Sequence, residues 1–329
     1  MKSLWIIFFA LLLSGTSIAQ PVITKTTYDD VMKLQDSVLL FKGKLKLINV
    51  YKQQLKVLYE NREQPERELR KALIKETYLP FQSFWNKYVG DSTIYYEQVM
   101  IPLIQNNLPA LDQRGLEFST ADVDNYFVAT ANTLKKLSGY KAKGTWYLAF
   151  GSSVTDLGGF GNGQMVADLA NAKLTIDYLK LILPHEINHQ IYDLSAPKDT
   201  TAKGLYRCIN EGFAVYMNEK ILGDDHPLSA YFQYTEPELK FCFDNDSMIF
   251  SKLNRFLLTS DNDHAVAFAD RGTKIFRGGP GAIGYYMGYR ICESYVKSHG
   301  EQSWKAIYSM PVREVFNGSR YGEKAVPKK

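Results

Sequence analysis

Hydrophobic residues recur every three or four positions through the first part of the chain, and this spacing predicts amphipathic helices. The apolar residues that follow it are Val31, Leu34, Val38, Phe41, Leu45, Leu47, Tyr51, Leu55 and Leu58. Pro65 marks a break between two helices, and later prolines separate further helical stretches up to residue 137. We therefore predict a helical N-terminal region over residues 20–139. A layer that completes the core is favoured over a cap or an inhibitory pro-region.

The pattern changes after Tyr140, where two segments predict strands. Residues 144–150 have the aromatic density of a buried strand, and residues 164–169 predict a second strand. The glycine-rich residues 158–163 predict the turn across which these two strands pair. The expected fold class is α+β and mostly helical, with a small antiparallel sheet ahead of a long apolar helix. Residues 140–329 form the second predicted domain.

The first residues have the pattern of a secretory signal peptide. Lys2 precedes ten apolar residues, and Ser17 and Ala19 give the small-residue cleavage pattern before Gln20. Ten apolar residues are too few to span a bilayer, which disfavours a membrane anchor. The cleavage point has no cysteine, which argues against a lipoprotein. We predict a signal peptide over residues 1–19 and an exported protein, periplasmic or extracellular, without a stable membrane span.

Composition narrows the expected partners. The net charge of +4 is too small to imply a nucleic-acid partner, and the aromatic content of 13% suits a broad core. The three cysteines, Cys208, Cys242 and Cys292, are widely spaced and fit no metal pattern. In an oxidising compartment one pair could be bridged, but the sequence does not choose the pair.

An H-E-x-x-H run, His185 to His189, is the strongest chemical signal in the sequence. On a helix the two histidines lie one turn apart on the same face, where they can bind one Zn²⁺, and Glu186 can take a proton from metal-bound water. A catalytic zinc needs a third protein ligand. Glu211 opens another helical run 22 residues after His189 and is the predicted third ligand, although an acidic helix start is a plainer interpretation of it.

Pro184 directly precedes this motif and cannot donate a hydrogen bond to Lys180. It should either kink the helix or begin a new one. In both cases His185 stays on a helical turn, so the predicted ligand geometry survives.

Together these motifs resemble the gluzincins, metallopeptidases whose zinc is held by the two histidines of H-E-x-x-H and a glutamate on the next helix. The N-E-G-F-A run at residues 210–214 and Gln190 are similar to the aminopeptidase-N-like branch, and the overall layout is similar to small predicted zinc-dependent proteases of bacteria. The resemblance covers about residues 141–321. It implies a thermolysin-like or gluzincin-like catalytic domain, with residues 164–169 as the edge strand of a substrate groove.

The resemblance also implies a tyrosine that stabilises the oxyanion. The run at residues 284–289 is similar to a late G-Y-x-x-G-Y helix of the small predicted proteases, and Tyr285 is preferred there over Tyr286 and Tyr289. The plainer alternative is a set of core aromatics. His226 and His264 are further candidates for this role, although each fits a surface or turn histidine better.

The predicted function is therefore that of an exported zinc metallopeptidase, a hydrolase with a peptide or protein substrate. Glu186 is its general base, and endopeptidase action is expected because no acid stands on the strand at residues 163–167 to hold a free amine. The alternative is a non-catalytic envelope binding protein that keeps the metallopeptidase fold. Glu186 favours the enzyme, since a pure binding site needs no carboxylate there. The sequence leaves the substrate and the oligomeric state open.

Overall fold

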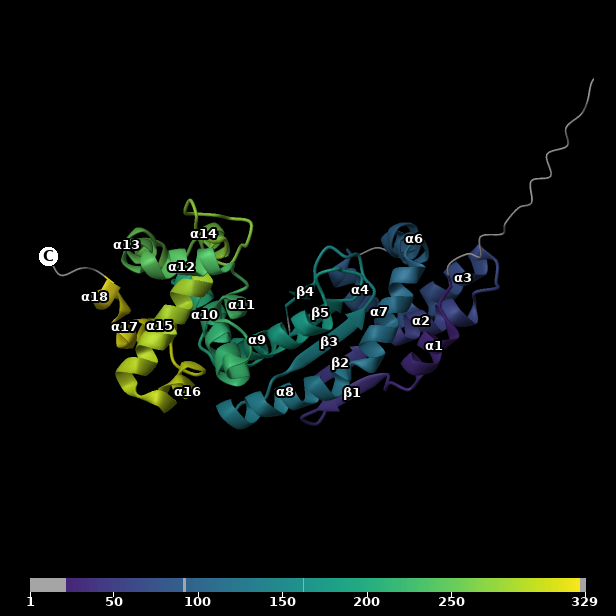
Figure 1. Cartoon of the computed structure of the whole chain (residues 1–329), viewed down its shortest axis with the longest axis horizontal. Coiled ribbons are helices and arrows are strands. Elements are labelled where there is room, and N and C mark those ends of the chain that lie inside the picture. The colour runs from purple at the N-terminus through teal and green to yellow at the C-terminus, as the bar shows by residue number, and fades with distance from the viewer. Residues whose placement is uncertain (1–21, 91–92, 162, 326–329) are drawn as a thin grey trace, which may run out of the picture.

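A five-stranded sheet with its helices and a group of C-terminal helices lie at opposite ends of an elongated molecule, and helix α9 (Ile176–Ser195) lies between them (Figure 1). The computed structural model describes residues 22–90, 93–161 and 163–325, so the predicted signal peptide lies outside the described residues. The prediction of a mostly helical α+β fold is confirmed.

The remaining helices divide between these two ends. Those that precede α9 are α1 (Lys25–Met32), α2 (Val50–Glu60), α3 (Glu66–Leu73), α4 (Gln82–Tyr88), α5 (Thr93–Tyr95), α6 (Ile101–Asn106), α7 (Leu108–Thr120) and α8 (Val123–Ser138). Those that follow it are α10 (Lys203–Leu222), α11 (Leu228–Phe232), α12 (Glu236–Asp244), α13 (Asp246–Leu257), α14 (Asn262–Ala267), α15 (Gly284–His299), α16 (Trp304–Ile307), α17 (Val312–Ser319) and α18 (Tyr321–Ala325).

The sheet is mixed, which corrects the prediction of an antiparallel sheet. Its order is β1 (Ser37–Leu40), β2 (Leu45–Asn49), β3 (Gly144–Ala149), β5 (Gln164–Asp168) and β4 (Leu157–Gly159). Strands β2, β3 and β5 are parallel, whereas β1 and β4 are antiparallel to their neighbours. The glycine-rich turn joins β4 to β5 and not β3 to β5, because the chain first reverses direction through β4. Strand β5 therefore runs parallel to β3.

Two strands replace part of the predicted N-terminal helices. Phe41, Lys42 and Gly43 have positive φ angles of 52°, 62° and 74°, a conformation that ends regular structure and turns the chain between β1 and β2. In β2, Leu45 and Leu47 are buried while Lys46 is exposed, which is the alternation of a half-buried strand. Strand β2 pairs with β3, so the sheet draws on both predicted domains, and the boundary at residue 140 stays a prediction.

Helix α9 is unbroken at Pro184, and other side chains satisfy the freed backbone groups. Thr175 caps its start by accepting a hydrogen bond from the Tyr178 amide. Pro184 leaves the Lys180 carbonyl without its usual helical donor, and the Tyr126 hydroxyl donates to that oxygen at 2.7 Å. The next carbonyl, that of Leu181, accepts from Asn218 on α10. The H-E-x-x-H run therefore stays in one helical register.

Helices α10 and α15 cross with their backbones in contact. A Cβ on Gly288 would lie 1.6 Å from the Cys208 carbonyl oxygen, and one on Gly212 would lie 1.9 Å from the Tyr289 amide nitrogen. Only glycine fits at such a crossing. The contact fixes how far α10 is shifted along its axis relative to α15, and therefore the position of Glu211 relative to Tyr285.

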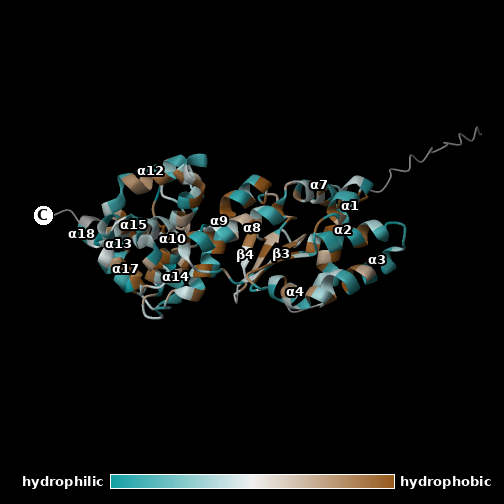
Figure 2. Cartoon of the chain, turned by 90° about the horizontal axis from the view of Figure 1, so that it is seen from below, coloured by the Kyte–Doolittle hydropathy of each residue, from teal (hydrophilic) through white to brown (hydrophobic). Residues whose placement is uncertain are grey.

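The core runs from the sheet into the C-terminal helices. Figure 2 shows hydrophobic residues on β3 and mixed hydrophobic and hydrophilic faces on the surrounding helices. Cys208, Cys242 and Cys292 are all buried with free thiols, so no pair of them is bridged. Within the described part of the chain, no helix combines the length and the apolar character that a bilayer crossing requires.

Replacing Gly288 by alanine tests the helix crossing. The added methyl group meets backbone atoms that cannot move independently, so we expect the free energy of unfolding to fall by about 3 kcal/mol or more. Urea unfolding followed by circular dichroism measures this loss. Lys297→Ala, at an exposed position of the same helix, should change stability by only about 0.5 kcal/mol or less. A Gly288→Ala protein as stable as the wild type would contradict the backbone contact.

Candidate metal centre

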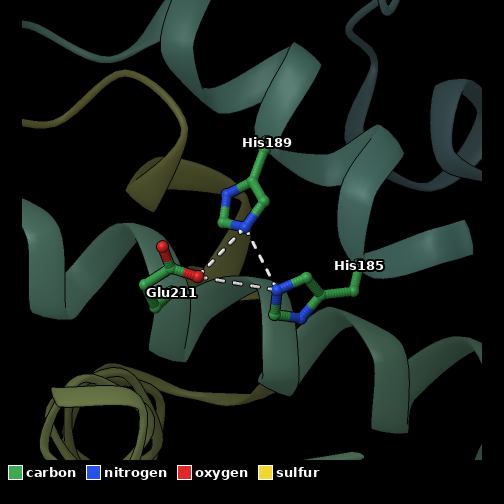
Figure 3. A group of neighbouring side chains, drawn as sticks. All are labelled: His185, His189 and Glu211. Carbon is green, nitrogen blue, oxygen red and sulfur yellow. Dashed lines mark hydrogen bonds and ion pairs between the residues drawn. The ribbon is translucent and has the colours of Figure 1, made fainter. Parts of the chain in front are cut away.

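Three side chains predicted from sequence as metal ligands meet at one point between two helices (Figure 3). His185 and His189 extend from α9, and Glu211 extends from α10. The His185 and His189 Nε2 atoms are 3.1 Å apart, and Glu211 Oε2 lies 3.2 Å from His189 Nε2 and 3.6 Å from His185 Nε2. The loop between the helices is thus short enough for Glu211 to reach both histidines.

The donor set fits a tetrahedral zinc ion. Bonds of about 2.0–2.2 Å place tetrahedral donors about 3.3–3.5 Å apart, and the three separations lie around this value. Two imidazole nitrogens with one carboxylate oxygen are ligands that zinc accepts. Glu211 Oε2 is buried, makes no hydrogen bond within the described residues and faces the two imidazole nitrogens, so it can serve as a ligand between them. The residues therefore fit a divalent metal ion.

Asn210 orients one of the two imidazoles. Its Oδ1 lies 2.8 Å from His189 Nδ1, so the Nδ1–H donates to the amide and Nε2 is the ring atom that faces the other donors. The Asn210 amide nitrogen donates in turn to Asp193, which also accepts from the Tyr206 hydroxyl. These contacts hold the His189 ring at a defined angle. Asn210 had no predicted role, although it directly precedes the predicted ligand Glu211 in the sequence.

The three groups have different charges when no metal is bound. Burial lowers the pKa of His185, so this ring is neutral. Burial also opposes charge on His189, but the Glu211 carboxylate outweighs it and raises the pKa of His189 to about 10. Burial of Glu211 is likewise outweighed, by His189 above all, and the pKa of this carboxyl falls well below its usual value. The metal-free site therefore holds a buried His189–Glu211 ion pair.

The two residues predicted as catalytic also lie beside the cluster. Glu186 is half-buried, and no hydrogen bond within the described part of the chain holds its carboxylate. The Tyr285 ring stacks on His185, with centroids 5.8 Å apart and an angle of 7° between the planes. Burial raises the pKa of Tyr285 well above 10, and the Glu211 carboxylate adds to this shift, so its hydroxyl stays protonated. The Arg271 guanidinium covers the same ring at 4.6 Å.

The other candidates for the oxyanion role have different partners. Tyr286 donates to Asp246, and Tyr289 donates to Glu219. His264 pairs with Asp261 at the exposed start of α14, and His226 lies edge-on to the Tyr231 ring. Their hydroxyl and imidazole groups therefore have structural contacts of their own.

The predicted edge of a substrate groove is covered. Strand β5 lies between β3 and β4, so its backbone is paired on both sides. An extended peptide cannot add to β5, which corrects the role expected for residues 164–169. Gln190 links this sheet to α9: it accepts from the Trp146 indole and donates to the Gly163 carbonyl.

The fold and site thus define an α+β protein with a buried cluster of two histidines and one carboxylate on adjacent helices. The chain is similar over residues 164–323 to a family model described as gliding motility protein GldB, which covers slightly less than half of the 329 residues. No curated protein and no solved structure matches the chain.

This family match overturns the peptidase prediction. The matched residues include all of α9 and α10. The description of the family names gliding motility and does not name proteolysis. The predictions of a gluzincin-type peptidase, of an enzyme, and of hydrolysis of a peptide substrate are therefore wrong. The motif predicted a set of donor atoms, and those donors do meet, but donor geometry alone does not make a peptidase. The roles given to Glu186 and Tyr285 lose their basis with that prediction.

The pH dependence of stability tests the metal-free ion pair. The folded pKa of His189 lies near 10, above its unfolded value of about 6.5, so its stabilising contribution is complete below pH 6.5 and is lost as the pH rises towards 10. In the presence of a chelator, we expect wild-type unfolding free energy to fall by roughly a few kcal/mol more than that of His189→Gln between pH 6.5 and 10. Denaturant titrations measure both proteins. Parallel pH curves would contradict the ion pair.

Proposed function

We propose that this chain is a non-catalytic binding protein of the cell envelope that serves gliding motility. The observation that carries this proposal is the match to the gliding motility family over residues 164–323, which includes both helices of the candidate metal centre. The signal-peptide pattern at residues 1–19 supports export. The covered β5 edge is consistent with a protein that does not thread an extended peptide past the cluster.

We further propose that His185, His189 and Glu211 hold one Zn²⁺. The separations of their donor atoms and the buried Glu211 oxygen that faces both imidazole nitrogens support this assignment. A bound zinc ion would crosslink α9 to α10 and offer a coordination position to a donor atom of a partner. The role of Asn210 is to keep His189 in the tautomer whose Nε2 is free to bind.

Genetic complementation tests the functional proposal. Deleting the gene in the native host should reduce spreading over a surface, and the wild-type gene should restore it. Glu186→Gln should restore spreading equally, because a binding protein does not need this carboxylate as a base. Protein levels in the envelope are compared by immunoblot. A deletion without a motility defect, or a Glu186→Gln protein that is present at normal level and binds zinc but fails to restore spreading, would refute the proposal.

The affinity for zinc tests the metal assignment. Asn210→Ala removes the acceptor that orients His189, so we expect zinc binding to weaken by about 10–100-fold while the fold is retained. Competition with a chromogenic chelator measures the affinity, and circular dichroism monitors the fold. Asn317→Ala, at an exposed asparagine of α17, is the matched control and should bind zinc as the wild type does. Equal affinities for Asn210→Ala and the wild type would contradict the orienting role.

A further inference from the structure

Seven exposed lysines gather at one end of the sheet and form what we call the lysine patch. None of them takes part in an ion pair within the described residues, whereas Lys25, Arg70, Lys240 and Lys297 each pair with an acid on their own helix. The elements that carry the lysine patch, α8 and the β1–β2 pair, lie side by side along the lower side of the molecule in Figure 1. The members of the patch are Lys42, Lys44, Lys46, Lys135, Lys136, Lys141 and Lys143.

Three segments that are distant in sequence bring these lysines together. The first is the β1–β2 turn with the start of β2, the second is the last turn of α8, and the third is the connection from α8 to β3. The Gly144 amide donates to the Lys44 carbonyl at 2.9 Å, which joins the first segment to the third. The Lys135 ammonium lies 5.5 Å from the centroid of the Phe41 ring, which joins the second segment to the first.

The chain separates charge sharply around this patch. Residues 37–59 and 125–155 contain nine lysines and neither an acidic residue nor an arginine. The whole chain carries only +4, so the rest of it is net negative. Lys135 and Lys136 interact favourably with the C-terminal end of the α8 dipole. That local effect does not account for the five lysines outside the helix, which repel one another across the patch.

An apolar side chain lies among the lysines. Leu39 is the cross-strand partner of Lys46 in the β1–β2 pair and is 61% exposed. Both residues point away from the core, because Leu45 and Leu47 occupy the buried face of β2. Lysines around an exposed leucine are the composition of a surface that meets a membrane, where the cations contact headgroups and the apolar group enters the interface.

We propose that the lysine patch docks the protein on an anionic membrane surface through phospholipid headgroups. Lysines near a negatively charged leaflet gain attraction that decays within a Debye length, so seven of them gathered at one end of the sheet act together. The absence of arginine favours a diffuse charge interaction over recognition of one phosphate group, because lysine lacks the planar fork that binds an anion bidentately. This docking goes beyond the proposed function and does not use the metal centre.

Vesicle sedimentation of the purified full-length exported protein tests the proposal. The wild type should bind vesicles of equal parts phosphatidylglycerol and phosphatidylcholine, should not bind pure phosphatidylcholine, and should dissociate as salt is raised. The variant Lys44→Gln/Lys136→Gln/Lys143→Gln takes one lysine from each segment. At roughly fivefold per lysine, its affinity for the anionic vesicles should fall about a hundredfold. Circular dichroism and the melting temperature verify that it is folded.

A control variant separates the patch from net charge. Lys240→Gln/Lys252→Gln/Lys297→Gln removes the same charge from exposed positions of the C-terminal helices and should bind vesicles as the wild type does. Equal losses in the two triple variants would assign binding to net charge and overturn the patch. Absence of wild-type binding to anionic vesicles would leave the lysines as a solvated face and also overturn it. Binding to a single-stranded oligonucleotide without binding to vesicles would overturn the membrane assignment.

Discussion

Burial of the Glu211 carboxylate is the constraint around which the C-terminal half is organised. An ionised carboxylate out of water costs several kcal/mol unless cations or metal ions compensate it. His185 and His189 supply that compensation only if α9 and α10 keep a fixed relative height. The Asn218 hydrogen bond from α10 to the Leu181 carbonyl joins these two helices, and the glycine contact with α15 holds α10 from its other neighbour.

The site also depends on how α9 tolerates a proline one residue before a ligand. Pro184 removes a helical hydrogen bond, and a break there would turn the half of α9 that carries both histidines relative to its first half. Tyr126 on α8 donates to the freed carbonyl, so the N-terminal half stabilises the turn that carries the site. With the β2–β3 pairing, this contact joins residues before 140 to the part of the chain that carries the site.

The metal donors and the function are separable properties of this chain. Helical periodicity places His185 and His189 on one face of α9, and the packing of α10 against α9 brings Glu211 to them. The peptidase groove predicted from sequence also needs an open strand beside the donors, and here β4 covers β5. The charge distribution adds a second feature: lysines concentrate at the sheet end while the buried ion pair lies between α9 and α10.

The sequence by itself determined the mostly helical α+β class, the helix that carries H-E-x-x-H, and the identity of Glu211 as its neighbour. The first two follow from local periodicity, whereas Glu211 was predicted from the resemblance of the joint motif. Tertiary structure decided the rest. Phe41 and Leu45 fit a helical spacing, yet the left-handed turn at residues 41–43 and pairing with β3 make this segment a hairpin. The parallel β3–β5 pair, the orientation of His189 by Asn210 and the gathering of seven lysines join residues distant in sequence, and no local pattern encodes such contacts.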